Sequence, residues 1–189
     1  MHAAIAIPLR SLDSMTATGM PATSPDIALV DAARAGDSDA FGRLYAEHAR
    51  MVHGIMLARV PRDDADDLVQ EVFLAAFRKL HTLRDAAAFG PWLCMIARNR
   101  ARDYYRHSRE TVELTDEIGS ADPPEAESIL AVVQTLPEAY RETLVLRLVE
   151  GMTGPEIAER TGLTPASVRV NLHRGMKQLR EKLTGGRHE

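Results

Sequence analysis

The stretch TGPEIAERTGLTPASVRVNLHRGMKQLREKL, residues 153–183, decides the fold of the C-terminal part of the chain. It begins with Thr153 and Glu156 three residues apart, the spacing of a capping box at a helix start. Gly162 permits a left-handed turn where this short helix ends. Thr164 and Pro165 then supply the cap and the first position of a second helix. Two helices joined by a tight turn predict a helix-turn-helix, a motif that binds DNA.

The second helix has two different faces when about 100° is allowed per residue. The inner face is apolar or small and comprises Val168, Leu172, Gly175, Met176, Leu179 and Leu183. We expect the outer face to enter a major groove, with the small Ala158 and Gly162 letting the two helices cross closely. The predicted base contacts are Ala166, Ser167, Arg169 and Val170, and the predicted phosphate contacts are Arg174, Lys177 and Arg180. His173, on the same face, is either a DNA contact or an ordinary surface histidine.

The formal net charge of -4 is unusual for a nucleic-acid binder, but the charges are unevenly distributed. Residues 98–109 contain five arginines against one acid, Asp103. Residues 110–127 contain seven acids and no lysine or arginine, and positive charge returns in the last helix. The sequence therefore predicts two basic elements separated by an acidic spacer. The single cysteine, Cys94, excludes an intrachain disulfide framework and a cysteine-based zinc site, as suits a reducing cytoplasm.

Apolar residues recur with helical period almost throughout the chain, which predicts an all-α fold of two small helical domains. We expect residues 1–25 to be a disordered leader, without a secretion signal, and residues 26–107 to form three or four helices. The acidic segment 108–127, with Gly119, Pro123 and Pro124, is predicted to be a flexible linker. Residues 128–185 form the second unit. No segment approaches a membrane span.

The clearest helix of the first unit runs from about Asp63 to Leu80. Its predicted core stripe comprises Val69, Val72, Phe73, Ala76, Phe77 and Leu80. Another face gathers acidic and amide groups, namely Asp63, Asp64, Asp66, Asp67, Gln70 and Glu71. These acids either complement the helix dipole on a solvated face or form a docking surface for a basic partner.

The next helix, about Pro91 to Arg109, separates apolar from basic residues. Its inner side comprises Leu93, Ile96, Ala97, Ala101 and Tyr104, and its opposite side comprises Arg98, Arg102, Arg106 and Arg109. Trp92, Asn99 and Asp103 lie between the two. A row of arginines beside an indole and an amide can hold phosphates and stack against exposed bases. The alternative is an ordinary amphipathic helix with Trp92 in the core.

Taken in order, the segments Asp66 to Phe73, Phe89, Trp92 to Asn99 and Leu136-Pro137, with the helix-turn-helix, resemble the bacterial sigma-70 family. More narrowly, the chain resembles its extracytoplasmic-function group, which keeps only regions 2 and 4. The resemblance implies that the first unit docks on the beta-prime clamp helices of core RNA polymerase through Asp66, Asp67, Gln70, Glu71 and Phe73. It also implies that the loop from Leu83 to Phe89 captures a flipped base of the -10 promoter element. The implied -10 contacts are Phe89, Trp92, Arg98, Asn99, Arg102, Asp103 and Arg106.

The resemblance further implies that the second unit reads the -35 element through Ser167, Arg169, His173 and Arg174. Residues 144–148 would pack near the polymerase beta flap, and an anti-sigma factor would control the chain. The acidic linker either threads toward the polymerase active-site cleft or only adds solubility. Two places depart from the family pattern: Gly90-Pro91 precedes Trp92, and Val170-Asn171 stands where many relatives carry arginine or serine.

Other function classes are less consistent with the sequence. A stand-alone helix-turn-helix regulator would have no use for the arginine row beside Trp92, and a sigma-like decoy would not need both basic faces. No phosphate-binding glycine loop, metal-ligand spacing or paired nucleophile indicates an enzyme, so no cofactor is expected.

Overall fold

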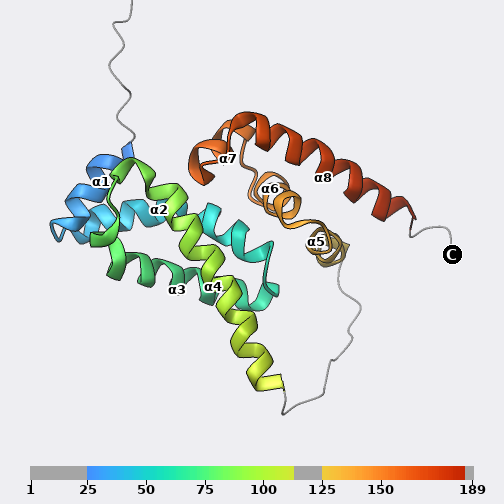
Figure 1. Ribbon diagram of the computed structural model, residues 1–189, viewed down its shortest axis with the longest axis horizontal. Helices are drawn as coiled ribbons and strands as arrows, with labels where there is room; N and C mark the ends of the chain where they lie inside the picture. Colours follow the sequence, from blue (N-terminus) through green and yellow to red (C-terminus); the bar gives the residue numbers. More distant parts are fainter. Residues whose placement is uncertain (1–24, 113–124, 186–189) are drawn as a thin grey trace, which may run out of the picture.

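The computed structural model describes residues 25–112 and 125–185, and every regular element within them is helical (Figure 1). The α-helices are α1 (Pro25–Arg34), α2 (Ser38–Leu57), α3 (Arg62–Lys79), α4 (Phe89–Val112), α5 (Glu125–Gln134), α6 (Glu138–Leu148), α7 (Gly154–Thr161) and α8 (Pro165–Gly185). Two short 3-10 helices, η1 (Leu80–Thr82) and η2 (Ala86–Ala88), connect α3 to α4. The predicted all-α class is confirmed.

The first unit, α1 to α4, has its core between α2, α3 and α4. Helix α2 begins where the Asp37 carboxylate accepts two backbone amides, and its inner residues Met51 and Ile55 are fully buried. The α3 core stripe is as predicted except at Phe77, which is 52% exposed. The Phe77 ring meets the ring of Phe41 edge-on at the rim of the unit, with centroids 4.9 Å apart. Helical periodicity placed Phe77 in the core wrongly, because it cannot locate the edge of the neighbouring helix.

In the second unit the predicted helix ends are confirmed. The Thr153 hydroxyl accepts the Glu156 amide at 3.4 Å while the Glu156 carboxylate accepts the Thr153 amide at 2.7 Å. Gly162 ends α7 in the left-handed conformation with φ 73°. The Thr164 hydroxyl accepts the Ser167 amide at 3.1 Å, which caps α8.

Two predictions about the packing of this unit are wrong. Leu183 is 41% exposed rather than buried in the inner face of α8. Gly162 does not let α7 and α8 cross closely, because the neighbour at its Cβ position is Pro91 of α4. The close approach of α8 is to α6, where Gly175 would place a Cβ 3.0 Å from a methyl of Leu144.

The predicted linker is shorter than residues 108–127. Helix α4 continues to Val112, because residues 108–112 include no glycine or proline that would end it, and α5 already begins at Glu125. Residues 113–124 of the predicted linker, and residues 1–24 of the predicted leader, lie outside the described residues. Within the described ranges, no helix is both long and apolar enough to cross a membrane.

The two units pack directly against one another. Helix α6 lies against α2, and α7 lies against both α2 and α4. Figure 1 shows α4 crossing α2 and α3, with α6 to α8 on the side of α4 where the end of α2 and the start of α3 lie. We call the contacts of α6, α7 and the loop between them with α2 and α4 the junction. The sequence did not predict it.

Candidate nucleic-acid and partner interfaces

The outer face of α8 is open to solvent at the positions predicted to contact duplex DNA. The exposed residues are Ala166, Arg169, Val170, His173, Arg174 and Lys177. Ser167 is only half-exposed, and its hydroxyl lies 2.8 Å from that of Thr164, so this side chain also serves the helix cap. Among the described residues, Arg169 and Arg174 have no carboxylate partner, whereas Lys177 lies 3.9 Å from Glu181. Helix α8 thus presents free guanidinium groups near its N-terminal end.

In the arginine row of α4, by contrast, Arg98, Arg102 and Arg106 each have a partner within the protein. The Arg98 guanidinium pairs with Glu142 of α6, and Arg106 lies 3.2 Å from Asp103 within α4. Arg102 donates to the amide oxygen of Asn99 at 2.5 Å. The predicted -10 residues Asn99, Arg102, Asp103 and Arg106 therefore share one side of α4. Arg98, at the start of that row, is turned to the junction.

Two of the aromatic residues predicted to contact partners are buried. Phe89 is fully buried, with its ring against His48 and its centroid 5.9 Å from that of Trp92, so it offers no surface to a DNA base in this conformation. Trp92 is half-buried above it. Phe73, 3% exposed, packs against Tyr45 with centroids 4.5 Å apart. Phe89 and Phe73 therefore position the surfaces above them.

The acidic face of α3 is exposed, as a docking surface requires. Asp66, Asp67, Gln70 and Glu71 all face solvent. Glu71 also pairs with Arg100 of α4. An apolar continuation of this face was missed from the sequence: Leu74 is 55% exposed and Phe77 52% exposed. A solvated helix face would not be expected to end in two large exposed apolar side chains, which favours a docking surface.

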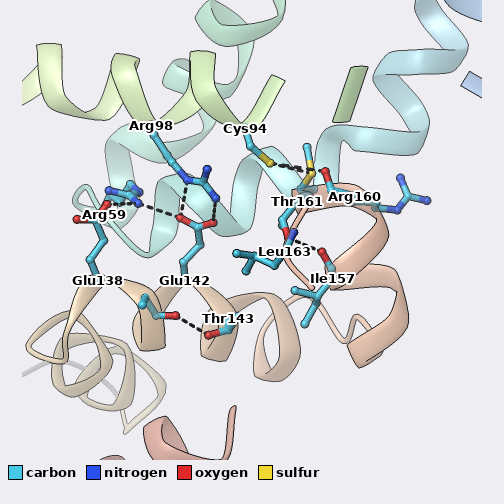
Figure 2. A network of polar contacts seen from close by, with 12 residues as sticks. Arg59, Cys94, Arg98, Glu138, Glu142, Thr143, Ile157, Arg160, Thr161 and Leu163 are labelled. Carbon is cyan, nitrogen blue, oxygen red and sulfur yellow. Dashed lines mark hydrogen bonds and ion pairs between the residues drawn. The ribbon is translucent and has the colours of Figure 1, made fainter. Parts of the chain in front are cut away.

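Glu142 is the main residue that sequence reasoning missed. Its side chain is 7% exposed, and its carboxylate accepts hydrogen bonds from Arg98 at 2.6 and 3.1 Å and from Arg59 at 2.9 Å (Figure 2). Burial raises the pKa of Glu142, but the hydrogen bonds and positive charges of Arg98 and Arg59 outweigh it, so the net pKa is lowered. A buried carboxylate is thereby kept ionised between two cations, Arg98 of α4 and Arg59 of the turn between α2 and α3. The sequence offers little signal for it, because apolar and polar residues are not separated into two faces along α6.

A second ionic contact crosses the junction at His53 of α2. Its Nδ1 lies 2.6 Å from the Glu150 carboxylate, and its Nε2 lies 3.6 Å from Asp66 of α3. The hydrogen bond to Glu150 raises the pKa of His53, and the negative charges of Glu150 and Asp66 raise it further. Burial and the positive charge of Arg62 lower the pKa, but the net shift is upward. The His53 imidazole therefore gains a proton more readily here than in an unfolded chain.

The described residues form no metal centre. Among residues 25–112 and 125–185, no three His, Cys, Asp or Glu side chains gather closely enough to hold a metal ion. The hollow beside the junction is lined instead by four arginines, Arg59, Arg98, Arg102 and Arg141, with Glu138. Such a surface can bind anions, and arginine binds phosphate as well as carboxylate oxygens in a bidentate manner.

Comparison with known proteins finds similarity over both helical units. Residues 44–111 match the family model described as Sigma-70 region 2, and residues 126–179 match the one described as Sigma-70, region 4. The RNA polymerase sigma factor CarQ of Myxococcus xanthus is 37% identical over 162 residues, which are 79% of this chain and 92% of CarQ. The ECF RNA polymerase sigma-E factor of Haemophilus influenzae is 28% identical over 179 residues, 84% of this chain and 95% of that protein.

A solved structure is similar as well. The structure of CnrH in complex with the cytosolic domain of CnrY is 29% identical to this chain, with a TM-score of 0.59. The similarity covers 85% of this chain and 97% of that one. Both helical units thus have counterparts in a protein that was solved with a bound partner domain.

Proposed function

The chain belongs to the sigma-70 family of RNA polymerase sigma factors, in its extracytoplasmic-function group, and we propose that it is a promoter-specificity subunit of RNA polymerase. In this role it binds the core enzyme, recognises the -10 and -35 promoter elements and has no catalytic activity of its own. The observation that carries the proposal is the presence, on one chain, of an exposed acidic face on α3 and basic faces on both α4 and α8.

The -35 element is read by α8. Its N-terminal residues Ser167 and Arg169 face base edges when the helix enters a major groove, and arginine pairs with guanine through two hydrogen bonds. Arg174 and Lys177, further along the same face, bind phosphates and fix the register without reading sequence. His173 lies between the two sets and is exposed, which supports a contact with the same DNA.

The -10 element is held by α4. Opened DNA exposes base faces and a flexible backbone, and Trp92 with Asn99 can stack on and hydrogen-bond to such bases. Arg102 and Arg106 bind the phosphates on the same side of the helix. Buried Phe89 fixes the position of Trp92 from below. The loop from Leu83 to Phe89 borders this region and is the proposed pocket for a flipped base.

Core RNA polymerase binds the α3 face through Asp66, Asp67, Gln70 and Glu71, on the beta-prime clamp helices. Exposed Leu74 and Phe77 extend that contact with apolar area. The beta flap packs near the end of α6, where Leu148 is 50% exposed. A polymerase subunit works in the cytoplasm, which we propose as the location of this chain.

An anti-sigma factor is the proposed regulator. The similar protein CnrH was solved in complex with the cytosolic domain of CnrY, which supports a comparable partner for this chain. The exposed apolar residues of α3 and of the α6 end are surfaces on which such a partner would compete with polymerase.

Run-off transcription with core polymerase and a genomic promoter library tests the proposal. We expect this chain to add promoter-specific transcripts, and their absence with inhibitor-free protein would refute it. Arg169→Ala should reduce discrimination at the -35 element, whereas Asp67→Ala should chiefly weaken core binding. Arg43→Ala and Glu159→Ala, both at exposed positions outside these faces, are the matched controls. Equal loss of both functions in both test variants would contradict this division of roles.

A further inference from the structure

An arginine-lined hollow lies where α4 and the turn after α2 face the start of α6. Its volume is about 570 Å³. Its polar and aromatic lining comprises Arg59, Arg98, Arg102, Tyr105, Glu138 and Arg141. Small-molecule sites in proteins have volumes of about 300–1,000 Å³, so the hollow has room for one molecule of nucleotide size.

The hollow keeps an excess of positive charge. Four guanidinium groups face two carboxylates, Glu138 in the lining and Glu142 behind it. Arg59 pairs with both acids, at 2.6 and 2.9 Å, and Arg98 pairs with Glu142 at 2.6 Å (Figure 2). These pairs use up both carboxylates. The remaining positive charge belongs to the other two arginines, and it favours an anion in the hollow.

Arg102 and Arg141 form no ion pair within the described part of the chain. Arg102 donates to the amide oxygen of Asn99 at 2.5 Å, and Arg141 donates to the backbone carbonyl of Gln134 at 3.0 Å. A guanidinium carries five N–H donors, so both groups keep donors without an acceptor. The Nε of Arg141 is buried, and no described group accepts from it. Phosphate oxygens are acceptors that fit such forked donors.

An aromatic ring borders the same hollow. Tyr105 is 47% exposed, and its hydroxyl donates to the backbone carbonyl of Arg59 at 2.7 Å, which holds the ring beside the arginines. Bases stack on exposed aromatic rings, whereas arginines bind phosphates. The hollow therefore combines a group for a base with groups for the phosphates attached to it.

We propose that this hollow binds a free nucleoside di- or triphosphate, with its phosphates on Arg102 and Arg141 and its base on Tyr105. A nucleic-acid strand fits less well, because single-strand sites follow a groove for about 4–16 nucleotides and this hollow has room for about one. An inorganic polyphosphate would leave the Tyr105 ring without a partner. The site goes beyond the proposed promoter function and does not depend on it.

Arg141→Gln is the principal variant, because Arg141 lies outside the proposed DNA-binding residues. Its matched control is Arg147→Gln, on the same helix α6. Arg147 also donates to a backbone carbonyl, that of Met152 at 3.1 Å, but it does not line the hollow. Both variants lose one positive charge and one hydrogen bond of the same kind. Circular dichroism checks that each keeps its helices.

Isothermal titration calorimetry of the full chain with ATP, inorganic triphosphate and adenosine, all in EDTA, measures the binding. We expect one ATP per chain, weaker binding of triphosphate and none of adenosine. Arg141→Gln should weaken both ATP and triphosphate by about tenfold to a hundredfold, because each loses hydrogen bonds to a charged group. Arg147→Gln should leave both affinities unchanged. No saturable binding up to about 1 mM ATP, or equal losses in the two arginine variants, would overturn the proposal.

Two substitutions of Tyr105 test the position of the base. Tyr105→Leu should weaken ATP by about fivefold or more and leave triphosphate unchanged, because only ATP has a base to stack. Tyr105→Phe keeps the ring and should retain most of the ATP affinity. If Tyr105→Leu weakens ATP and triphosphate equally, the ring supports only the shape of the hollow, and the nucleotide assignment is wrong.

Glu138→Gln should change the affinity in the opposite direction. The pair with Arg59 lowers the pKa of Glu138, so this carboxylate is charged at neutral pH and opposes a bound anion. Its replacement leaves Arg59 with a free donor, and we expect triphosphate to bind severalfold more tightly. Weaker triphosphate binding in Glu138→Gln would contradict the electrostatic basis of the site.

A pool of random single-stranded oligonucleotides, followed by fluorescence anisotropy, distinguishes a free nucleotide from a strand. We expect Arg141→Gln and Arg147→Gln to bind the pool equally well. If Arg141→Gln instead weakens the oligonucleotides as much as it weakens ATP, the hollow is part of a nucleic-acid track, and the nucleotide site is refuted.

Discussion

Gly162→Ala perturbs the turn of the helix-turn-helix and the junction together, and its effects can be separated. Gly162 has φ 73°, and a left-handed backbone costs a residue with a Cβ about 1–2 kcal/mol. The added Cβ would also lie 2.9 Å from the Pro91 Cγ, and overpacking of this kind costs about 1–3 kcal/mol. We therefore expect Gly162→Ala to lower the free energy of unfolding by about 2–5 kcal/mol in all.

Gly151→Ala supplies the matched control. Gly151 has a similar φ of 66°, but the nearest atom to its Cβ position is 3.5 Å away, on Arg50. Its substitution should cost only the backbone part, about 1–2 kcal/mol. Any gain from restricting the unfolded chain applies equally to both glycines and cancels in the difference.

Urea denaturation followed by circular dichroism measures the free energy of unfolding that each variant, Gly162→Ala and Gly151→Ala, loses. A double-mutant cycle then shows whether the larger loss in Gly162→Ala arises from contact with Pro91. Pro91→Ala removes the Cγ that the new methyl would meet, and proline is not required in the first turn of α4. We expect a coupling energy of about 0.5–3 kcal/mol between positions 91 and 162. Equal losses for Gly162→Ala and Gly151→Ala, with no coupling to Pro91, would show that α4 and the α7–α8 turn do not touch in solution.

Two smaller perturbations test the cap of α7 and the His53 contact. Thr153→Ala should lower the free energy of unfolding by about 1 kcal/mol, measured by urea denaturation, because it removes the cap of α7. The control Thr184→Ala, near the end of α8, should lower it much less. The raised pKa of His53 means that its contacts with Glu150 and Asp66 contribute fully below the ordinary value of about 6.5. That stability is lost as pH rises through the higher pKa of His53 in the folded chain. His53→Asn should abolish this part of the pH dependence of the free energy of unfolding. If the dependence of unfolding free energy on pH is unchanged in His53→Asn, His53 is not its source.

The features that the sequence predicted well depend on residues close together along the chain. Thr153 and Glu156 cap one another across three residues, and Gly162 adopts its left-handed turn through its own backbone freedom. Such signals need no knowledge of the tertiary structure. The helix ends, the helix-turn-helix and the exposure of most of the α8 face followed from them.

The features that the sequence did not predict depend on distant contacts. Glu142 lies 83 residues from Arg59 and 44 from Arg98, and nothing local distinguishes it from a surface glutamate. Phe77 and Leu183 follow the helical period of buried residues, yet they are 52% and 41% exposed. Periodicity finds the face of a helix, whereas burial at its edges depends on the length and angle of its neighbours.

The basic faces of α8 and α4 also differ in the groups that a DNA phosphate must displace from their arginines. On α8, Arg169 and Arg174 have no carboxylate partner among the described residues, so a phosphate replaces water and mobile counterions, and binding depends steeply on salt. On α4, a phosphate at Arg98, Arg100 or Arg106 must replace a carboxylate of the protein, because these arginines pair with Glu142, Glu71 and Asp103. Glu71 belongs to the proposed polymerase-binding face. A polymerase contact that takes the Glu71 carboxylate would therefore release the Arg100 guanidinium.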